Sequence, residues 1–366
     1  MQPRVRPRQP LARSRVSVVV PCYNYGHFLP DCVRSVLDQD GVDVDVLIVD
    51  DASPDGSAAV AHELAATEST AQPRVRVLAH PTNRGHIATY NEGLAAVDGE
   101  YVVLLSADDL LAPHSLVRSV ALMQAHPEVG LVYGFSPAFG DTPPPARDRV
   151  TSWSVWSGEE WLAQVCRRVS NPVATPEVVM RTALMRELVG YDARVPHAAD
   201  LLLWLRAAAR TAIGRVNGVD QAFYRKHGAN MHVERYSGVV TDIEEKRRTF
   251  EILFEEDRPD LPGAQRLHAT ARRALAREAL VTACQSYALD VAAGQRDKLV
   301  DLARDLDPAV DSTPAWQRYR RLAQRAGRGR GPVVPVRFSR AVDDVSRRVR
   351  WRRWRRYGLL GAVGSV

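Results

Sequence analysis

Residues 15–24, RVSVVVPCYN, decide how this chain folds. The stretch begins with a continuous run of apolar, mostly β-branched residues, and Pro21 ends it. An uninterrupted run without polar alternation is typical of a strand that is buried on both faces. Such strands occur mainly in parallel sheets that helices cover on both sides. The opening stretch therefore favours an α/β fold.

The segments that follow repeat this pattern with helical segments between them. Strands are predicted at 44–51, 74–80 and 100–109, and helices at 27–39, at 57–68 and within 83–99. Strands that alternate with helices imply a mostly parallel sheet with flanking helices. Ligands bind such sheets outside the carboxyl ends of the strands. Acidic turns follow two of the predicted strands, so a functional site is expected at that edge.

The length and charge distribution indicate more than one domain. A chain of 366 residues can hold a main domain and an accessory one. The pattern becomes mainly helical from about residue 240, and arginines are concentrated at 325–357. We therefore expect four parts: a flexible basic arm (1–14), the α/β domain (15–235), a helical C-terminal region (236–325) and an arginine-rich tail (326–366).

Several classes of protein are disfavoured by composition. No apolar run approaches the roughly 20 residues that span a bilayer, and the basic N-terminus lacks the apolar core of a signal peptide. A cytoplasmic location is the expectation. The four cysteines form no Cys-x-x-Cys pair, which argues against a zinc site and a disulfide framework. The tryptophans at 153, 156 and 161 have the spacing of core residues, and contact with a ligand is the alternative.

The stretch YVVLLSADDLLAP (101–113) runs from apolar residues into two adjacent acids, Asp108 and Asp109. Carboxylates at the end of a buried strand are costly unless a cation meets them. The alternative is that the two acids cap the helix that follows. Asp50 and Asp51 end an earlier strand in the same way, although DDASPDG also has the composition of an ordinary turn.

Four segments in this order resemble the family 2 glycosyltransferases with the GT-A fold. They are VSVVVPCYNYGHFLPDCVRSVLDQ, VLIVDDASPDGS, NRGHIATYNEGLAAVDGEYVVLLSADDLL and ADLLLWLRAA. The resemblance covers about residues 15–230. It implies a Rossmann-like GT-A fold and inverting transfer of a sugar from a UDP-, dTDP- or GDP-sugar to a hydroxyl group. A glycan or lipid-linked acceptor in envelope or exopolysaccharide synthesis is expected.

The resemblance also implies a divalent cation, Mn²⁺ or Mg²⁺, that joins the donor diphosphate to the protein. Asp108 matches the last acid of the family's Asp-x-Asp motif, and Ser106 replaces the first. His227, in FYRKHGANMH, is expected as a second metal ligand, and a purely structural histidine is the alternative. The residues expected to bind the nucleotide sugar are Pro21, Tyr23, Asn24, Asp50, Asp51, Asn83, Arg84, Gly85, Asp109 and Arg225.

These residue types suit that chemistry. Carboxylates accept hydrogen bonds from a base N–H or from ribose hydroxyls, and an aromatic ring such as Tyr23 offers a stacking face. Arg225 can neutralise phosphate charge. Inverting transfer needs a general base, and Asp200 matches the family's acid before Leu-Trp-Leu-Arg. Ala199 and Leu202 stand where the family often has further acids, and the alternative role for Asp200 is an N-cap.

Two alternatives remain at the level of the whole chain. The departures at Ser106, Ala199 and Leu202 favour a catalytically weak or inactive GT-A-fold protein that binds nucleotide sugars as a scaffold. The tail, which contains RRVRWRRWRRYG, is basic with interleaved tryptophans. Such a tail fits peripheral contact with an anionic membrane surface, on the inner face of the cytoplasmic membrane, or a solvated end. We do not expect nucleic acid as a partner.

Overall fold

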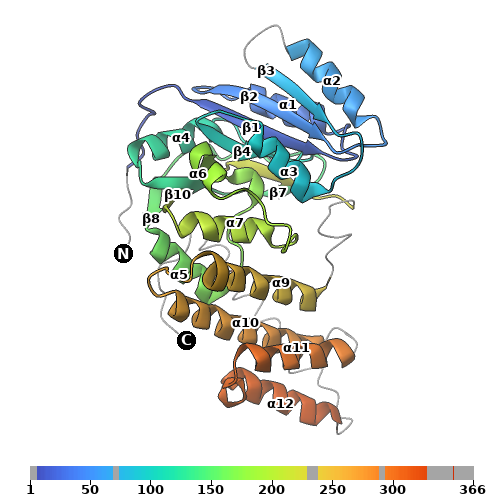
Figure 1. The fold of residues 1–366 in the computed structure, drawn as a ribbon, viewed down its shortest axis with the longest axis vertical. Coiled ribbons are helices and arrows are strands. Elements are labelled where there is room, and N and C mark those ends of the chain that lie inside the picture. Colours follow the sequence, from blue (N-terminus) through green and yellow to red (C-terminus); the bar gives the residue numbers. More distant parts are fainter. Residues whose placement is uncertain (1–5, 69–73, 229–237, 288–292, 328–348, 350–366) are drawn as a thin grey trace. The chain divides into compact units, whose positions relative to one another are not determined.

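The structure is a computed structural model that describes residues 6–68, 74–228, 238–287, 293–327 and 349 (Figure 1). Its described residues form two compact units. The first contains 6–161 and 171–228, and the second contains 162–170 and the described residues from 238 onward. The predicted tail (326–366) lies outside the described residues except for 326, 327 and 349.

The first unit is built around an eight-stranded sheet with the order β3-β2-β1-β4-β9-β6-β10-β8. The strands are β1 Arg15–Cys22, β2 Asp43–Asp50, β3 Arg74–Ala79, β4 Tyr101–Leu104, β6 Val129–Tyr133, β8 Ser152–Trp156, β9 Val179–Arg181 and β10 Ala212–Asn217. The neighbours among β3, β2, β1 and β4 are parallel, as are β6 and β10. β9 is antiparallel to both β4 and β6, and β8 is antiparallel to β10. The mostly parallel sheet expected from the sequence is confirmed.

Helices cover both faces of this sheet (Figure 1). They are α1 Leu29–Leu37, α2 Ser57–Glu68, α3 His86–Ala95, α4 Ser115–Ala125, α6 Thr182–Glu187 and α7 Ala199–Ala208, with a 3₁₀ turn, η1, at Thr175–Glu177. Helix α5 Gly158–Arg168 begins in the first unit, and its residues from Leu162 onward belong to the second. Val18 and Ile48 belong to the same core cluster as Cys32 of α1. The intervening Val19 lies under α3, where a Cβ atom on Gly93 would come within 2.4 Å of its side chain. The absence of a side chain at Gly93 therefore lets α3 pack closely on the strands.

A small second sheet returns the chain to the end of β4. Its strands are β5 Leu110–Leu111, β7 Ala138–Phe139 and β11 Ala222–Arg225, in the order β5-β11-β7. Phe223 pairs with Leu110, which follows the acids at 108 and 109 directly. This pairing carries the end of β11 to those acids.

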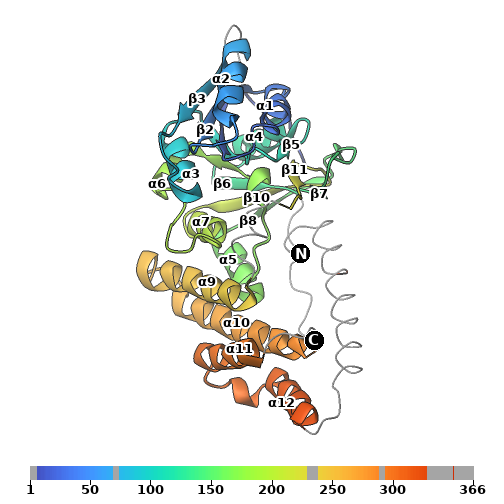
Figure 2. The ribbon, with the colours of Figure 1, turned by 90° about the vertical axis from the view of Figure 1, so that its right-hand side faces the viewer.

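The second unit is helical, as expected for the C-terminal region (Figure 2). Its further elements are α9 Val239–Glu251, a π-helical turn η2 at Ile252–Asp257, α10 Ala264–Ser286, α11 Ala293–Leu306, a 3₁₀ turn η3 at Val310–Ser312, and α12 Pro314–Gly327. The long helix α10 contacts α9, α11 and α12. Lys246 of α9 binds Asp242 on its own helix at 2.7 Å and Glu278 of α10 at 3.2 Å. This ion-paired triad joins the first two helices of the unit.

Two expectations about individual residue types are met. The four cysteines are buried free thiols. Trp153, Trp156 and Trp161 are buried to within about one per cent of complete burial, so the core interpretation of their spacing is correct. Within the part of the chain that the structure describes, no helix combines the length and apolar character needed to cross a bilayer.

Candidate active site

The parallel strands place their carboxyl ends at one edge of the sheet. Cys22 at the end of β1 is in register with Asp50 at the end of β2, and Asp50 is in register with Ala79 at the end of β3. Asp51 and His80 are the next residues in their respective segments. The predicted clustering of acidic turns at this edge is therefore present in the fold.

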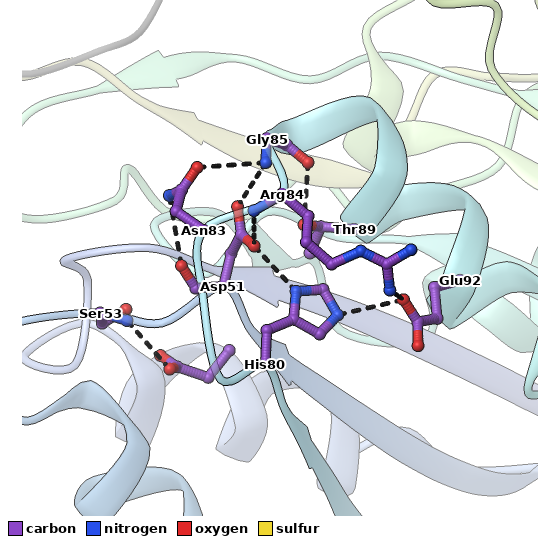
Figure 3. Close-up of polar contacts among 9 residues, drawn as sticks. Asp51, Ser53, His80, Asn83, Arg84, Gly85, Thr89 and Glu92 are labelled. Atoms are coloured by element: carbon purple, nitrogen blue, oxygen red, sulfur yellow. Dashed lines mark hydrogen bonds and ion pairs between the residues drawn. The ribbon is translucent and has the colours of Figure 1, made fainter.

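Asp51 organises the loop that leads into α3 (Figure 3). Its Oδ1 accepts the N–H of Arg84 at 2.8 Å and lies 2.8 Å from His80 Nδ1, and its Oδ2 accepts the N–H of Gly85 at 2.9 Å. Gly85 has a φ of 81°, which glycine adopts without strain. Burial alone would raise the pKa of Asp51, but these hydrogen bonds outweigh it, and the pKa is lowered. The carboxylate thus fixes the start of α3.

The neighbouring side chains complete this loop. Asn83 donates from Nδ2 to the Asp51 carbonyl at 3.2 Å and accepts the N–H of Gly85 at 3.1 Å. The Arg84 guanidinium pairs with Glu92 of α3, and His80 Nε2 lies 3.2 Å from the same carboxylate. The structure brings Asn83, Arg84 and Gly85 beside Asp51, as predicted from the sequence, and engages all three in holding the loop.

Asp50 differs from Asp51 in having one oxygen without a partner. Its Oδ2 accepts the N–H of Ser53 at 3.1 Å, whereas the buried Oδ1 has no hydrogen-bond donor among the described residues. Asn24, which donates its N–H to Ser53 Oγ at 3.0 Å, also has a buried Oδ1 that no described group satisfies. Buried acceptors without donors are costly, so both oxygens suit a ligand that supplies N–H or O–H groups.

Two further residues that the sequence predicts to bind the ligand, Pro21 and Tyr23, come shortly before Asn24 in the chain. Pro21 is buried within β1, and its carbonyl accepts the N–H of Ala107 at 3.3 Å. Tyr23 is 40% exposed, an unusual position for a large aromatic side chain. This exposed ring, one residue before Asn24 in the chain, is available for stacking on a planar ligand.

Asp108 and Asp109 are both buried beyond the end of β4. Asp108 Oδ2 lies 3.0 Å from His227 Nε2, and Asp109 Oδ1 accepts the N–H of Arg225 at 2.9 Å. Burial raises the pKa of Asp108 against the effect of His227. Burial and the neighbouring charge of Asp108 raise the pKa of Asp109 well above its usual range. Neither acid caps α4, because His114 occupies the N-cap position of that helix.

Arg225 supplies the cation beneath these acids. Its Nε donates to the carbonyl of Asp108 at 2.8 Å. The guanidinium carbon lies 4.5 Å from the ring centres of both Phe28 and Phe139, so the group is held between two aromatic faces. The position of this buried positive charge offsets part of the cost of burying Asp108 and Asp109.

The donor atoms near Asp108 fit a divalent cation. A carboxylate oxygen and an imidazole nitrogen are ligands that Mn²⁺ accepts, and Mg²⁺ is commonly held by one or two carboxylates together with substrate phosphates. Across the described ranges, no group of three or more His, Cys, Asp or Glu side chains forms a metal cluster. Asp108 Oδ2 and His227 Nε2, 3.0 Å apart, are the protein atoms here that would bind such an ion.

Asp200 lies in the first turn of α7, whose N-cap position is Ala198. Its Oδ1 accepts the N–H of Leu201 at 2.6 Å, and its Oδ2 accepts Nδ2 of Asn171 at 2.7 Å. Burial raises the pKa of Asp200 to about 6, against the opposing effects of the Leu201 N–H and the His197 charge. The side chain is still partly open to solvent. A carboxylate with these properties is suited to accept a proton near neutral pH.

Two tyrosines connect the carboxylates of the site. Burial raises the pKa of Tyr90, and the charges of Asp108, Asp109 and Asp200 raise it further. Burial together with the same three charges raises the pKa of Tyr224 to about 12. The charges of the same three carboxylates thus act on both phenols. The sequence motifs did not single out Tyr90.

Comparison with known proteins gives matches to one family of enzymes. Residues 17–184 match the family model "Glycosyl transferase family 2". An uncharacterized glycosyltransferase of Nostoc is 27% identical over 61% of this chain and 68% of its own length. The succinoglycan biosynthesis protein ExoO of Rhizobium meliloti is 34% identical over 29% of this chain and 28% of its own length. The match thus spans about a quarter of ExoO, and Asp200, Arg225 and His227 lie beyond the matched family segment.

Solved structures share the fold. TarS 1–349 of S. aureus in complex with UDP-GlcNAc superimposes with a TM-score of 0.59 and 18% identity, over 81% of this chain and 83% of that one. The mannosyltransferase PcManGT of Pyrobaculum calidifontis, in complex with GDP-Man and Mn²⁺, gives 0.56 and 20% identity over 92% and 86%. Together with the family match, these likenesses confirm the resemblance seen in the motifs: the chain carries a glycosyl transferase family 2 domain with the GT-A fold.

Proposed function

We propose that the chain is an inverting glycosyltransferase, which moves a sugar from a nucleotide-sugar donor to a hydroxyl group of a glycan or lipid-linked acceptor. The observation that carries the proposal is a set of buried acids in a chain with a family 2 match: Asp50 Oδ1 has no donor among the described residues, and Asp108 Oδ2 lies 3.0 Å from His227 Nε2. The similarity to a succinoglycan biosynthesis protein supports a role in envelope or exopolysaccharide synthesis.

The donor side is formed by the carboxyl edge of β1 and β2. The unsatisfied Oδ1 atoms of Asp50 and Asn24 would accept hydrogen bonds from the base or ribose, and Tyr23 would stack on the base. The UDP-GlcNAc and GDP-Man complexes of the structural neighbours support a nucleotide sugar as the ligand. We include UDP-, dTDP- and GDP-sugars among the candidates.

A divalent cation, Mn²⁺ or Mg²⁺, would be held by Asp108 and His227, which lie 3.0 Å apart. When bound, it would supply positive charge to the diphosphate that leaves the sugar. Arg225 keeps the main chain of Asp108 in place through its 2.8 Å hydrogen bond. The Mn²⁺ present in the PcManGT complex supports this assignment.

In the proposed reaction, Asp200 accepts the proton of the acceptor hydroxyl as that oxygen forms a bond to the anomeric carbon. The bond between this carbon and the diphosphate oxygen breaks, and its electron pair leaves with the nucleoside diphosphate. Attack from the face opposite the leaving group inverts the configuration in one displacement. With a pKa of about 6, Asp200 is about 90% ionised at pH 7 and ready to accept the proton.

A donor screen tests the proposal. Purified protein is incubated with Mn²⁺ or Mg²⁺ and a panel of nucleotide sugars, and released nucleoside diphosphate is measured. We expect slow, metal-dependent hydrolysis of one donor, which also identifies the sugar. Asp200→Asn should lower that turnover at least a hundredfold while leaving nucleoside diphosphate affinity within about twofold, because the side chain acts on the acceptor side. Unchanged turnover would remove Asp200 as the base.

The same screen separates the enzyme from a scaffold. Ser106, Ala199 and Leu202 depart from the family motif and favour a catalytically weak or inactive nucleotide-sugar-binding protein. Such a protein would bind a nucleoside diphosphate with metal but would release none from any donor, even when acceptor glycans are added. If binding also fails, both the enzyme and the sugar-nucleotide scaffold are excluded.

We also propose that the arginine-rich tail (326–366), most of which lies outside the described residues, makes peripheral contact with the anionic inner face of the cytoplasmic membrane. Helix α12 supports this partner, because it carries four arginines and no acidic residue: Arg318, Arg320, Arg321 and Arg325. Its apolar residues Trp316 and Leu322 are buried, whereas Arg320, Arg321 and Arg325 are exposed. Sedimentation with vesicles containing anionic lipid, compared with neutral vesicles, tests it. Equal sedimentation with both would contradict an electrostatic contact.

A further inference from the structure

Asn171 contacts the Asp200 carboxylate from outside α7. It lies between α5 and η1, 29 residues before Asp200 in the chain. Its Nδ2 donates to Asp200 Oδ2 at 2.7 Å, a length typical of a hydrogen bond to a charged oxygen. The pair is partly open to solvent, as a base that receives an acceptor hydroxyl must be.

The orientation of the Asn171 amide is fixed by a second contact. Asn171 Oδ1 accepts the main-chain N–H of Val173 at 3.1 Å. Only the amide oxygen can accept from an N–H, so the nitrogen must be the atom that faces Asp200. The side chain therefore presents a donor, and not an acceptor, to the carboxylate.

The groups around Asp200 act in both directions. The N–H of Leu201, the side chain of Asn171 and the charge of His197 favour the ionised carboxylate. Burial opposes them as the largest single effect. The phenols that share this field, Tyr90, Tyr191 and Tyr224, all have raised pKa values and so remain neutral when Asp200 titrates. Removing one of these hydrogen-bond donors should therefore raise the pKa of Asp200 measurably.

We propose that Asn171 is a positioning residue for the general base, which holds the Asp200 carboxylate in one orientation and favours its ionised form. The proposal rests on the assignment of Asp200 as the base. It adds to the site a residue for which the sequence carries no motif. Its chemistry is that of a neutral amide donor, which lowers the proton affinity of a carboxylate without introducing a competing charge.

Two substitutions separate this role from a merely structural one. Asn171→Asp has nearly the same shape and keeps an acceptor for the Val173 N–H, but it places a second carboxylate against Asp200. Asn171→Ala removes both contacts. A purely structural role predicts that both variants lose activity by a factor that does not change with pH. Positioning of the base predicts the larger effect for Asn171→Asp, because like charges oppose ionisation.

The first readout is the pH profile of kcat/KM, with the donor identified in the screen and water as the acceptor. For Asn171→Asp, we expect the acidic limb to move up by about 1–2 pH units, which lowers kcat/KM at pH 6.5 about three- to twentyfold. Activity should return to within about threefold of the wild type at pH 9. Asn171→Ala should move the limb in the same direction by about one unit or less. A wild-type profile for Asn171→Asp would overturn the proposal.

The second readout does not depend on turnover. The difference in Tm caused by Asp200→Asn is measured from pH 5 to 9, in the wild-type background and in the Asn171→Asp background. Because folding raises the pKa of Asp200, its ionised form costs stability, so this difference should grow as the pH rises through about 6. With Asn171→Asp, the midpoint should lie at higher pH, and an identical midpoint would contradict the proposal. If turnover proves independent of Asp200, the assignment of the base fails, while this midpoint still reports on Asn171.

Discussion

Replacing Asp51 with asparagine should destabilise the α/β unit strongly, although it changes a single atom. The carboxylate offers two acceptor oxygens to three donors, the N–H groups of Arg84 and Gly85 and the ring of His80, at 2.8–2.9 Å. An asparagine offers one acceptor and one NH₂ group. Whichever way the amide turns, a donor in the loop then faces another donor.

The expected loss in the free energy of unfolding is about 2–3 kcal/mol. Hydrogen bonds to charged groups contribute about 1.5–3 kcal/mol each, and a buried donor left unsatisfied costs about 1–3 kcal/mol. The full sum is not expected, since contacts in one network are not additive and His80 can change its tautomer. In a unit of this size, such a loss lowers Tm by about 5–10 °C.

The assay is urea unfolding followed by tryptophan fluorescence, because Trp153, Trp156, Trp161 and Trp204 are buried in this unit. Asp43→Asn is the matched control. Asp43 is half exposed and pairs with Arg13 at the surface, so the same change there should cost less than about 1 kcal/mol. If the two variants lose equal stability, Asp51 does not organise the loop in the way described.

The pH dependence of stability tests the role of Asp51 in a second, independent way. Folding lowers the pKa of Asp51 below its ordinary value of 3.8. The carboxylate therefore contributes its full stability above pH 3.8 and loses it as the pH falls toward the folded-state pKa. The gap between the wild type and Asp51→Asn should narrow below pH 3.8 and stay constant from pH 5 to 8. A gap that narrows at higher pH would assign the effect to another group.

Three further outcomes follow from the same site. Asp50→Asn should weaken binding of the nucleoside diphosphate about tenfold or more in calorimetry while leaving Tm equal or higher, because Asp50 Oδ1 has no donor in the described structure. Arg225→Lys keeps the positive charge but should lower both Tm and kcat, because an ammonium group cannot stack on the rings of Phe28 and Phe139 as the guanidinium does. The kcat/KM of the wild type should fall as the pH drops through about 6, where Asp200 gains its proton, and a limb near pH 4 would contradict the raised pKa.

The elements of the fold were predictable from local patterns, and so were the ends of the strands where the site lies. The apolar run in β1 and the acidic turns after β2 and β4 are local sequence patterns, and each lies where the pattern predicts it in the fold. The position of β9 could not be predicted in this way. Its three residues contain no pattern that indicates antiparallel pairing with both β4 and β6. Strand order depends on packing between distant segments, and local propensity carries no information about it.

The partners of the site residues were hidden for the same reason. His80 contacts Asp51 and Asn171 contacts Asp200, in each case across 29 residues and from a segment without a motif. Tyr90 lies in a helix whose sequence gives no sign that the charges of three carboxylates act on its phenol. Motifs identified the acids, while the groups that set the pKa of each acid came from loops that the fold brings alongside.

Asp50 and Asp51 show why a motif cannot assign roles within itself. The two residues are adjacent, identical in type and almost equally buried. Every oxygen of the Asp51 carboxylate has a donor, so this side chain stabilises the loop and has little capacity left for a ligand. The buried Oδ1 of Asp50 has no hydrogen-bond donor among the described residues, so we expect a bound ligand to supply that donor. Loss of the Asp50 carboxylate should therefore weaken ligand binding, whereas loss of the Asp51 carboxylate should lower the stability of the fold.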